Sequence, residues 1–485
     1  LMMEQTLDVK KNTLFNTIKS IFGIIYPLIT FPYISRVLLT ENVGKINFGN
    51  SVVSYFSLIA SLGVTTYAVR ECSKYKEDKV KLSEISSQIL SINVWSTIIA
   101  YLALGVTIIV ARPLDNYRTL IIIQSSTILF TTLGADWLNT AMEDFRFIAI
   151  RTMGMQVFSL ILMFILVRKP EHYLTYAVIS VIASSGANVI NIFYRRRYCK
   201  TKFVLRIDWR KHLPPILLLF SLILSQTIYT SSDMTILGLY KGDFQVGLYS
   251  TSVKMYNIVN TVVGSVAWVV MPQLSTNFAR HDYNQVNRLL KYSLNFIIVL
   301  GLPCLVGLNV ITKEIILLIA GEAYLGAELS LRILTLSLGF SFISGWIGNM
   351  MMLPAGKEKI CLKSSVISAV VNIVLNLILV PIWGLNAAAV TTAISEFLGI
   401  IIKRPYIDRE IRIDGLKQMF AAPGAGSFCI VAVSIVVRCF IESPYLIAIL
   451  TILLSGIVYF AILVLMKNEF VMNFLKPVIS KLKRS

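Results

Sequence analysis

The stretch LPPILLLFSLILSQTIYTSSDMTILGLYKGDFQVGLYSTSVKMYNIVNTVVGSVAWVVMPQ, residues 213–273, places charged residues inside sequence that is otherwise apolar enough for a lipid bilayer. Two apolar segments are joined by a short turn at 241–243; the first contains Asp233 and the second contains Lys254. A charge near the middle of a membrane span is costly unless it faces a bundle interior or a watery cavity. These two residues therefore mark a candidate functional site.

The composition of the whole chain indicates a membrane protein. Of 485 residues, 56% are hydrophobic and 15% are charged, and the mean hydropathy is +0.72. This composition excludes a soluble domain of such a size. Apolar runs of about 20 residues, which cross a bilayer core of roughly 30 Å, recur from end to end. The expected fold class is an all-α polytopic membrane protein without an extramembrane domain.

Fourteen spans are predicted, with thirteen as an alternative. They cover residues 13–38, 44–68, 85–110, 117–140, 148–167, 172–194, 213–239, 246–272, 290–311, 326–353, 362–380, 383–402, 418–440 and 444–466. Lys and Arg concentrate in alternate loops, with 33 on the side of the N-terminus and 9 on the opposite side. Because cytoplasmic loops collect positive charge, both termini are predicted to be cytoplasmic.

This topology also accounts for the formal net charge of +19. The basic run at 195–202 would lie on anionic headgroups, so anionic membrane lipids are an expected partner and nucleic acid is not. The six cysteines have no paired spacing. The three histidines, His172, His212 and His281, are far apart in short loops, where solvated side chains are expected rather than a metal site.

A faint internal repeat divides the chain. VGKINFGNSVV from Val43 and VGLYSTSVKMY from Val246 each open an even-numbered span after a short external turn, at an offset of 203 residues. Units of six spans repeated in this way are related by an axis along the membrane normal. We expect an N-lobe of helices 1–6 with a basic linker (1–205), a C-lobe of helices 7–12 (206–412), and helices 13–14 with a basic tail (413–485). A cavity between the lobes follows.

Oxygen-bearing side chains form a candidate cation site. Asp233 lies about mid-span, and Asn372 and Asn376 are four residues apart, on one helix face. With Thr392 in the following span, they offer the oxygen ligands that suit a hard monovalent cation such as Na⁺. Glu396, one turn beyond Thr392, could carry a proton. The alternative is that these Asn and Thr side chains only hydrogen-bond between helices, and the residue pattern leaves both interpretations open.

Four basic residues form a candidate anion site: Lys19, Arg36, Lys254 and Arg332. Basic side chains in a water-filled cavity would attract an anionic substrate, and phosphate is the commonest anion that needs Lys or Arg. Arg36 also suits a solvated span end, and Lys19 and Arg332 could reach the headgroups by snorkelling. The sequence contains no Gly-rich phosphate loop and no Ser or Cys nucleophile near a His, so we expect a transporter and not an enzyme.

Three segments resemble a known family. They are RVLLTENVGKINFGNSVVSYFSLIASLGVTTYAVRE from Arg36, SQTIYTSSDMTILGLYKGDFQVGLYSTSVKMY from Ser225, and GLNAAAVTTAISE from Gly384. The chain is similar along essentially its whole length to the Wzx-type polysaccharide-transport flippases of the MOP superfamily. The most specific pieces are Asp233 followed by Val246-Gly247-Leu248-Tyr249, and the pair Arg70-Glu71 that closes the second span.

The resemblance implies a monomeric protein of the bacterial cytoplasmic membrane that moves an undecaprenyl-pyrophosphate-linked oligosaccharide to the outer leaflet by alternating access. Units for capsule, O-antigen, exopolysaccharide or teichoic acid would be its cargo, and an envelope polymerase or ligase a partner. In the related lipid II flippases, basic residues of spans 1, 2 and 8 line the cavity, and a sodium site uses residues of spans 7, 11 and 12. The residues at similar places are Lys19, Lys254, Asp233, Asn372, Asn376 and Thr392.

Two positions depart from that pattern. Span 2 has Ser51 where the repeat offset would place the partner of Lys254, and the second position of the span 11 pair is Asn376 rather than an acid. Coupling to Na⁺ or to H⁺ therefore stays open. The rival is a MATE-type multidrug antiporter of the same fold, which exports organic cations and favours acids in the first lobe, whereas span 1 has Lys19. A scramblase or scaffold without coupled transport would not need the buried charges.

Overall fold

The computed structural model describes residues 2–473, with side chains described except at 2–14, 218, 221, 222, 225, 226, 229 and 268. The described part of the chain consists of helices and their connections, without a strand. The chain divides into two compact units, Leu1–Gly247 and Leu248–Ser485, and each is described by itself. The all-helical class predicted from composition is confirmed.

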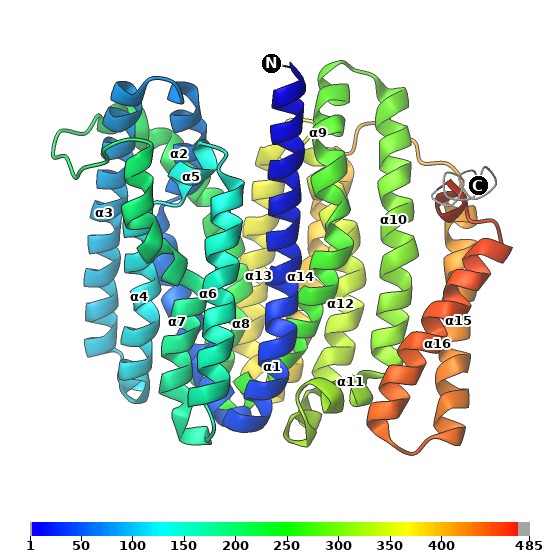
Figure 1. The fold of residues 1–485 in the computed structure, drawn as a ribbon. Coiled ribbons are helices and arrows are strands. Elements are labelled where there is room, and N and C mark those ends of the chain that lie inside the picture. Colours follow the sequence, from blue (N-terminus) through cyan, green and yellow to red (C-terminus); the bar gives the residue numbers. More distant parts are fainter. Residues whose placement is uncertain (1, 474–485) are drawn as a thin grey trace. The chain divides into compact units, whose positions relative to one another are not determined.

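The first unit is a bundle of helices that includes the long, broken first helix (Figure 1). Its helices are α1 (Met2–Ser61), α2 (Val64–Cys72), α3 (Lys79–Val110), α4 (Arg118–Gly134), α5 (Trp137–Ala141), α6 (Phe145–Leu166), α7 (Tyr173–Tyr194) and the first part of α8 (Trp209–Gly264), with 3₁₀ turns at Ser73–Tyr75, Arg112–Tyr117, Pro170–His172 and Arg195–Arg197. Helix α1 packs against α3, α4, α6 and α7, and α7 packs against α4 and α6.

Helix starts in this unit follow local chemistry. The side chain of Asp78 accepts hydrogen bonds from the backbone N–H groups of Val80 and Lys81. Asp144 accepts one from the N–H of Phe147 in the same way. An Asp at the N-cap satisfies N–H groups that have no partner within the helix, so α3 and α6 begin where the sequence supplies these caps.

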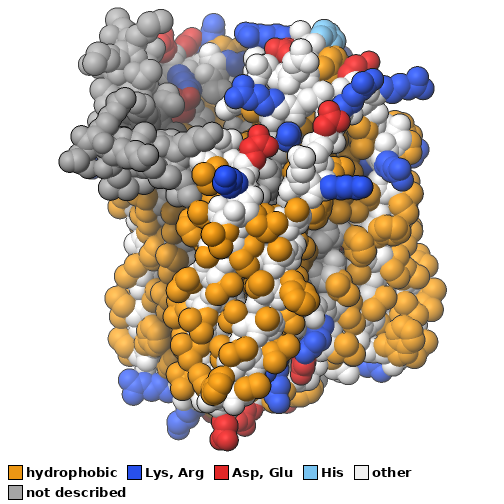
Figure 2. Space-filling view, turned by 90° about the vertical axis from the view of Figure 1, so that its right-hand side faces the viewer, with side chains coloured by type: hydrophobic (Ala, Val, Ile, Leu, Met, Phe, Trp, Pro, Cys, Tyr) orange, Lys and Arg blue, Asp and Glu red, His pale blue; other side chains and the backbone are white. Residues whose placement is uncertain are grey.

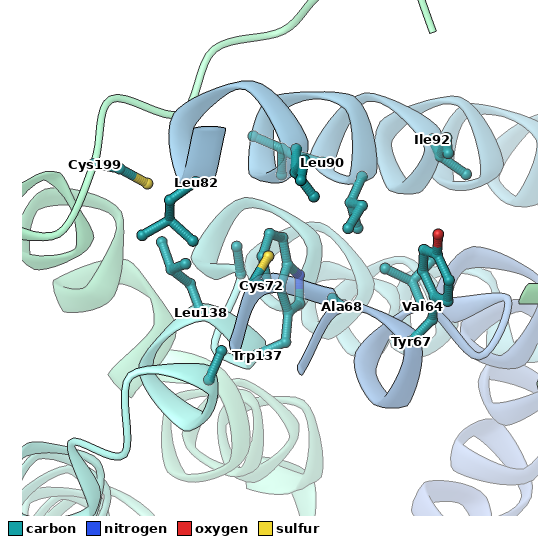
Figure 3. Close-up of a cluster of buried hydrophobic side chains, with 14 of the residues drawn as sticks. Val64, Tyr67, Ala68, Cys72, Leu82, Leu90, Ile92, Trp137, Leu138 and Cys199 are labelled. Atoms are coloured by element: carbon teal, nitrogen blue, oxygen red, sulfur yellow. The ribbon is translucent and has the colours of Figure 1, made fainter. Parts of the chain in front are cut away.

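A cluster of buried hydrophobic side chains joins the short helices at one end of the first unit (Figure 3). Cys72 of α2 and Leu82 of α3 pack with Trp137 and Leu138 of α5, and Cys199, from the segment after α7, completes the cluster. Burial of these side chains stabilises the loop ends by the hydrophobic effect. The short helices and turns that connect the long helices at this end are therefore held in place by a small hydrophobic core.

The second unit contains the remaining helices. They are the end of α8, α9 (Val266–Ala279), α10 (Tyr283–Val310), α11 (Thr312–Ile319), α12 (Glu328–Trp346), a π-helical segment (Ile347–Met352), α13 (Glu358–Trp383), α14 (Leu385–Lys403), α15 (Leu416–Phe440) and α16 (Pro444–Leu465), with 3₁₀ turns at Glu322–Ala327 and Arg404–Tyr406. Helix α14 packs against α12 and α13, α10 against α9, α12 and α15, and α16 against α15 and α11.

Ten helices of the described residues are long and apolar enough to cross a membrane, or eleven if the bent pair Thr230–Gly264 and Val269–Ala279 is one span. Each of the fourteen predicted ranges falls on helical structure, although some ranges extend over two consecutive elements, as 44–68 does over α1 and α2 and 117–140 over α4 and α5. The counts differ because α1 and α8 each contain two predicted spans, and α4, with 17 residues, is shorter than the roughly 20 that a bilayer core requires. Fourteen spans stay a prediction.

The outer surface is apolar where lipid would contact it. Figure 2 shows one face on which hydrophobic side chains form a broad band, with Lys, Arg, Asp and Glu gathered above and below. Phe428 and Ile457, from α15 and α16, are among the exposed apolar side chains. Because hydrocarbon cannot solvate charges, a band of this kind is expected of a membrane-spanning protein.

The boundary between the two units differs from the predicted lobe boundary. The units divide at 247/248, so the first arm of α8 belongs to the first unit. The lobes 1–205 and 206–412, and the separate part 413–485, rest on the internal repeat and stay predictions.

Candidate functional site

Two long helices are broken at equivalent places. Leu39, inside α1, has φ 62° and ψ 171°, and Gly242, inside α8, has φ 78° and ψ −179°. Residues 39 and 242 are separated by the 203 residues that the internal repeat predicts. A positive φ is readily adopted by glycine and costs free energy at a leucine. The tertiary packing therefore holds Leu39 in the conformation that Gly242 adopts without strain.

Two glycines of the repeat pack reciprocally next to these breaks. A Cβ added to Gly44 would overlap the backbone carbonyl of Asp243, and a Cβ added to Gly247 would overlap the carbonyl of Thr40. Asp243 follows the break in α8 as Thr40 follows the break in α1. The two copies of the repeat thus meet backbone to backbone, with each glycine contacting the turn of the other copy.

Asp233 is buried beside a hydroxyl network that joins the two broken helices. The Thr235 hydroxyl donates to Ser51 Oγ over 2.9 Å and lies 3.0 Å from the hydroxyl of Tyr55. Ser54 donates to Ser231 over 2.8 Å. Asp233, 6% exposed, is near enough for its charge to act on Tyr55. Ser51, which replaces the expected cation of span 2, thus contributes a hydroxyl to the surroundings of the acid.

The basic residues of the first unit occupy different environments. Lys19 is partly buried on α1, and the charge of Arg151, on α6, acts on it. Arg151 is buried, forms an ion pair with Asp136, and donates to the Ala187 carbonyl of α7 over 2.8 Å. Arg36 is exposed and donates to the Pro32 carbonyl over 2.7 Å. Lys19 and Arg151 therefore form a basic pair inside the unit, whereas Arg36 lies at its surface.

The amide pair of the second unit takes part in a hydrogen-bonded chain between α13 and α14. Asn376 Nδ2 donates to Asn372 Oδ1 over 3.1 Å, and Thr391 Oγ1 donates to Asn376 Oδ1 over 2.7 Å. The Tyr249 hydroxyl lies 3.5 Å from that of Thr392. These contacts are the polar links between helices that one interpretation predicted. Amide and hydroxyl oxygens are also the ligand types that a hard cation prefers, so the cation site stays a prediction.

Two further charged groups lie on α14. The Tyr256 hydroxyl is 3.5 Å from Glu396 Oε1. Lys403 is buried, and its ammonium donates to both the carbonyl and the hydroxyl of Ser344 over 2.7 Å. The charge of Glu396 acts on Lys403. Glu396 therefore lies near a tyrosine hydroxyl and close enough to a buried ammonium for their charges to interact, and its role in proton coupling stays a prediction.

The remaining predicted cations lie on α8 and α12. Lys254 is partly buried in the second arm of α8. The Arg332 guanidinium donates to Glu328 Oε1 over 2.9 Å, one turn earlier on α12, and forms an ion pair with it. The roles of Lys254 and Arg332 in an anion site stay predictions.

The predicted site residues fall into two groups. Hydrogen bonds link Asn372 and Asn376 of α13 with Thr391 of α14. Thr392 donates to the Ala388 carbonyl of its own helix, and Asp233 belongs to the first unit. Sequence reasoning missed the buried cations Arg151 and Lys403, since Arg151 lies near the start of its predicted span, 148–167, and Lys403 lies one residue beyond the end of its own, 383–402, so both were counted with the loop charges. Both residues lie within a few residues of a predicted span end, and this closeness was the signal in the sequence that they could be buried.

Comparisons with known proteins agree with the predicted resemblance. The family described as "Polysaccharide biosynthesis protein" matches residues 9–278. A "Putative O-antigen transporter" of Shigella dysenteriae is 22% identical over 403 residues, covering 81% of this chain and 98% of the relative. The "Capsular polysaccharide biosynthesis protein CapF" of Staphylococcus aureus is 24% identical over 403 residues, covering 81% of this chain and 97% of the relative.

Solved structures show the same fold. "Lipid II flippase MurJ, inward closed conformation" superposes with a TM-score of 0.76 at 17% identity, covering 96% of this chain and 100% of that chain. An inward-facing "multidrug resistance MATE family transporter of the MOP superfamily" has a TM-score of 0.56 at 14% identity, covering 85% of this chain and 99% of that chain. At these identities the likeness concerns the fold alone.

Proposed function

Because this chain belongs to the polysaccharide biosynthesis protein family, we propose that it carries a polyprenyl-pyrophosphate-linked oligosaccharide from the cytoplasmic to the outer leaflet of a bacterial cytoplasmic membrane. The chain is a flippase-type transporter and not an enzyme. Its cargo would be a precursor of a surface polysaccharide, such as O-antigen or capsule. The names of the two relatives support this substrate class.

The observation that carries the proposal is the partly buried Lys254, the charged residue of the second arm of α8 between residues 244 and 264. An intramembrane cation is retained when it binds an anion or lines a path. The pyrophosphate of the cargo is such an anion, and the partly buried Lys19 adds basic charge in the first unit. An exporter of organic cations would repel its substrate from these groups, so we favour the lipid-linked anion.

The symmetry of the two broken helices supports alternating access. The breaks at Leu39 and Gly242 lie on the side opposite the N-terminus, which the positive-inside rule predicts to be external. There Gly44 and Gly247 bring the two copies of the repeat into backbone contact. In the proposed cycle this contact forms when the external side is closed and separates when the cargo leaves.

Ion coupling is the second part of the proposal. Asn372, Asn376 and Thr392 supply oxygens in the second unit, and Asp233 supplies a buried carboxylate in the first. Bound Na⁺, or a proton on Asp233 or Glu396, would neutralise buried negative charge and so favour one conformation over the other. Asp233→Asn is expected to remove the dependence of export on external sodium or pH. Export that keeps its ion dependence in this variant would refute the assignment.

The test of the anion site replaces Lys254 in the full-length chain, expressed in a host strain that lacks its own copy. Lys254→Ala is expected to reduce surface polysaccharide at least tenfold and to accumulate lipid-linked precursor in the inner leaflet, since loss of one ion pair costs more than about 1.4 kcal/mol in a low-dielectric site. Lys254→Arg keeps the charge and should retain partial export. Lys359→Ala, at an exposed position of α13, is the matched control.

Protein levels in the membrane are measured for each variant, so that loss of export is separated from loss of folding. Wild-type polysaccharide in Lys254→Ala would refute the cationic site. Loss of export without accumulation of a lipid-linked saccharide would instead refute the cargo class.

A further inference from the structure

A pocket of about 620 Å³ opens in the first unit, apart from the residues considered so far. It lies where α5 and the start of α6 meet the end of α7 (Figure 1). The lining residues are Met142, Glu143, Asp144, Arg146, Phe147, Ile150, Tyr194, Arg197 and Tyr198. This end of the unit is also that of the N-terminus, which is predicted to be cytoplasmic. The pocket is therefore at the level of the inner headgroups.

The two acids of the pocket already have partners. Glu143 forms an ion pair with Lys76 over 2.6 Å. Asp144 Oδ2 accepts hydrogen bonds from the hydroxyls of Tyr194 over 2.9 Å and Tyr198 over 2.6 Å. Burial and the neighbouring Asp144 carboxylate raise the pKa of Tyr198, so this phenol stays a donor. Both acids keep their negative charge, so the three positive charges of Lys76, Arg146 and Arg197 exceed the charge of the two carboxylates by one.

The two arginines of the pocket remain without an acid. Arg197 Nη1 makes one long hydrogen bond of 3.4 Å, to the Tyr194 hydroxyl. The Arg146 guanidinium lies 6.0 Å from the centre of the Phe15 ring. Among the described residues neither forms an ion pair, and both side chains are exposed. Two guanidinium groups beside one pocket form a site that an anion with several oxygens can satisfy.

An apolar surface continues from the pocket toward the membrane. Ile150 follows Arg146 by one turn of α6 and is exposed, as is Phe193 next to Tyr194 on α7. Exposed apolar side chains at the end of a membrane helix contact acyl chains, while basic side chains one turn away reach the headgroups. Along α6 a basic residue, Arg146, is therefore followed toward the membrane by an apolar one, Ile150. A phospholipid has the same order, with its phosphate at the surface and its acyl chains inside the membrane.

We propose that this pocket binds the phosphate headgroup of an anionic phospholipid of the inner leaflet, between Arg146 and Arg197, with an acyl chain along Ile150. Basic pockets between membrane helices on the cytoplasmic side bind such headgroups. A bulk phospholipid is favoured as the source because the apolar strip begins directly beside the pocket. The bound lipid would join α5, α6 and α7 at their cytoplasmic ends.

The test uses the purified full-length chain in neutral detergent, titrated with phosphatidylglycerol and followed by native mass spectrometry. The pocket variant is Arg146→Gln with Arg197→Gln. The control is Arg206→Gln with Arg210→Gln, two exposed arginines on the same predicted side that do not line the pocket. The pocket variant loses the charge-assisted hydrogen bonds of two guanidinium groups to the phosphate and should bind at least tenfold more weakly, whereas the control keeps these bonds and should bind within about threefold of the wild type.

Three results would overturn the proposal. Equal loss in both double variants would indicate diffuse surface charge, and equal binding of phosphatidylcholine would exclude an anion site. Displacement of bound phosphatidylglycerol by undecaprenyl pyrophosphate at a concentration lower than that of phosphatidylglycerol would assign the pocket to the transported lipid. Thermal unfolding distinguishes a folding defect from a loss of lipid binding. Without lipid, the pocket variant should have the melting temperature of the wild type. With phosphatidylglycerol, the melting temperature should rise for the wild type and stay unchanged for the pocket variant.

Discussion

Gly44 and Gly247 are positions where the absence of a side chain is a structural requirement. Both have helical backbone angles, so the requirement comes from the facing backbone and not from an unusual φ. Other glycines of the chain differ in this respect, since a Cβ added to Gly105 would meet nothing within 4 Å. A substitution by alanine thus has different consequences at glycines that look alike in the sequence.

Gly44→Ala is expected to lower the free energy of unfolding by about 2 kcal/mol, because the added methyl overlaps a backbone carbonyl that cannot turn away. Thermal unfolding of the purified protein in detergent measures the effect. Gly105→Ala should be neutral or slightly stabilising, since alanine has the higher helix propensity. Equal stability of the two variants would show that the contact at Asp243 is not maintained.

His212 is a second residue whose environment the sequence did not reveal. The histidines were expected to be solvated, and for His212 this was wrong, since it is buried with Nδ1 2.7 Å from the Tyr67 hydroxyl. The residue lies in the first turn of α8, where the chain packs against α2. Burial, with the charge of Lys211 second, lowers the pKa of His212 below its ordinary value.

This shift makes stability depend on pH. A folded-state pKa below the unfolded value of about 6.5 means that the unfolded chain binds the proton more readily. The free energy of unfolding should therefore fall as the pH drops through about 6.5, and should level off below the folded-state pKa. Melting curves between about pH 5 and pH 8 should show a smaller change for His212→Gln than for the wild type. The same pH profile in both proteins would contradict the burial of a neutral imidazole.

At the scale of elements, one ion pair joins three helices of the first unit. Asp136, at the N-cap of α5, pairs with Arg151 on α6, and the same guanidinium donates to the Ala187 carbonyl on α7. Arg151 is almost fully buried whereas Asp136 is partly exposed. Loss of either partner leaves a charge without its counterpart, which is costly in proportion to its burial.

Arg151→Met is expected to lower the free energy of unfolding by about 2 kcal/mol, less than for a fully buried pair because Asp136 reaches solvent. Asp136→Asn alone should also destabilise the protein, since the buried guanidinium stays charged. In the double variant the second change should add little, because the interaction is already lost. Strictly additive effects in thermal unfolding would show that the two side chains act independently.

At the scale of the whole molecule, the arrangement of positive charge predicts the orientation in the membrane. The loop at 112–117 is predicted to be external and the loop at 198–208 cytoplasmic. Cysteine-free protein with Asn116→Cys should react with a membrane-impermeant maleimide in spheroplasts, and Arg206→Cys should react only after lysis. Both positions are exposed in the structure, so a reversed pattern would contradict the predicted topology.

Much of the architecture could be predicted from the sequence, as the broken helices show. The short turns after Leu39 and Gly242 were placed from the repeat, and both fall at breaks in the structure. The predicted family is confirmed by the model that matches residues 9–278, whereas the flippase function stays a proposal. The site was less predictable: Asn376 and Thr392 were identified as candidate ligands, but Asn376 accepts its hydrogen bond from Thr391, and this depends on how α13 and α14 pack.

The sequence by itself determined the all-helical membrane class, the places of the helices and the family, because apolar length, loop charge and local motifs are properties of neighbouring residues. Only the tertiary structure decided that Arg151 is buried against Asp136 and that Ser51 bonds to Thr235. It also decided that Gly44 and Gly247 each contact the backbone of the other copy of the repeat. Those contacts join residues far apart in the chain, and whether a charge is paired or solvated depends on the distance between them.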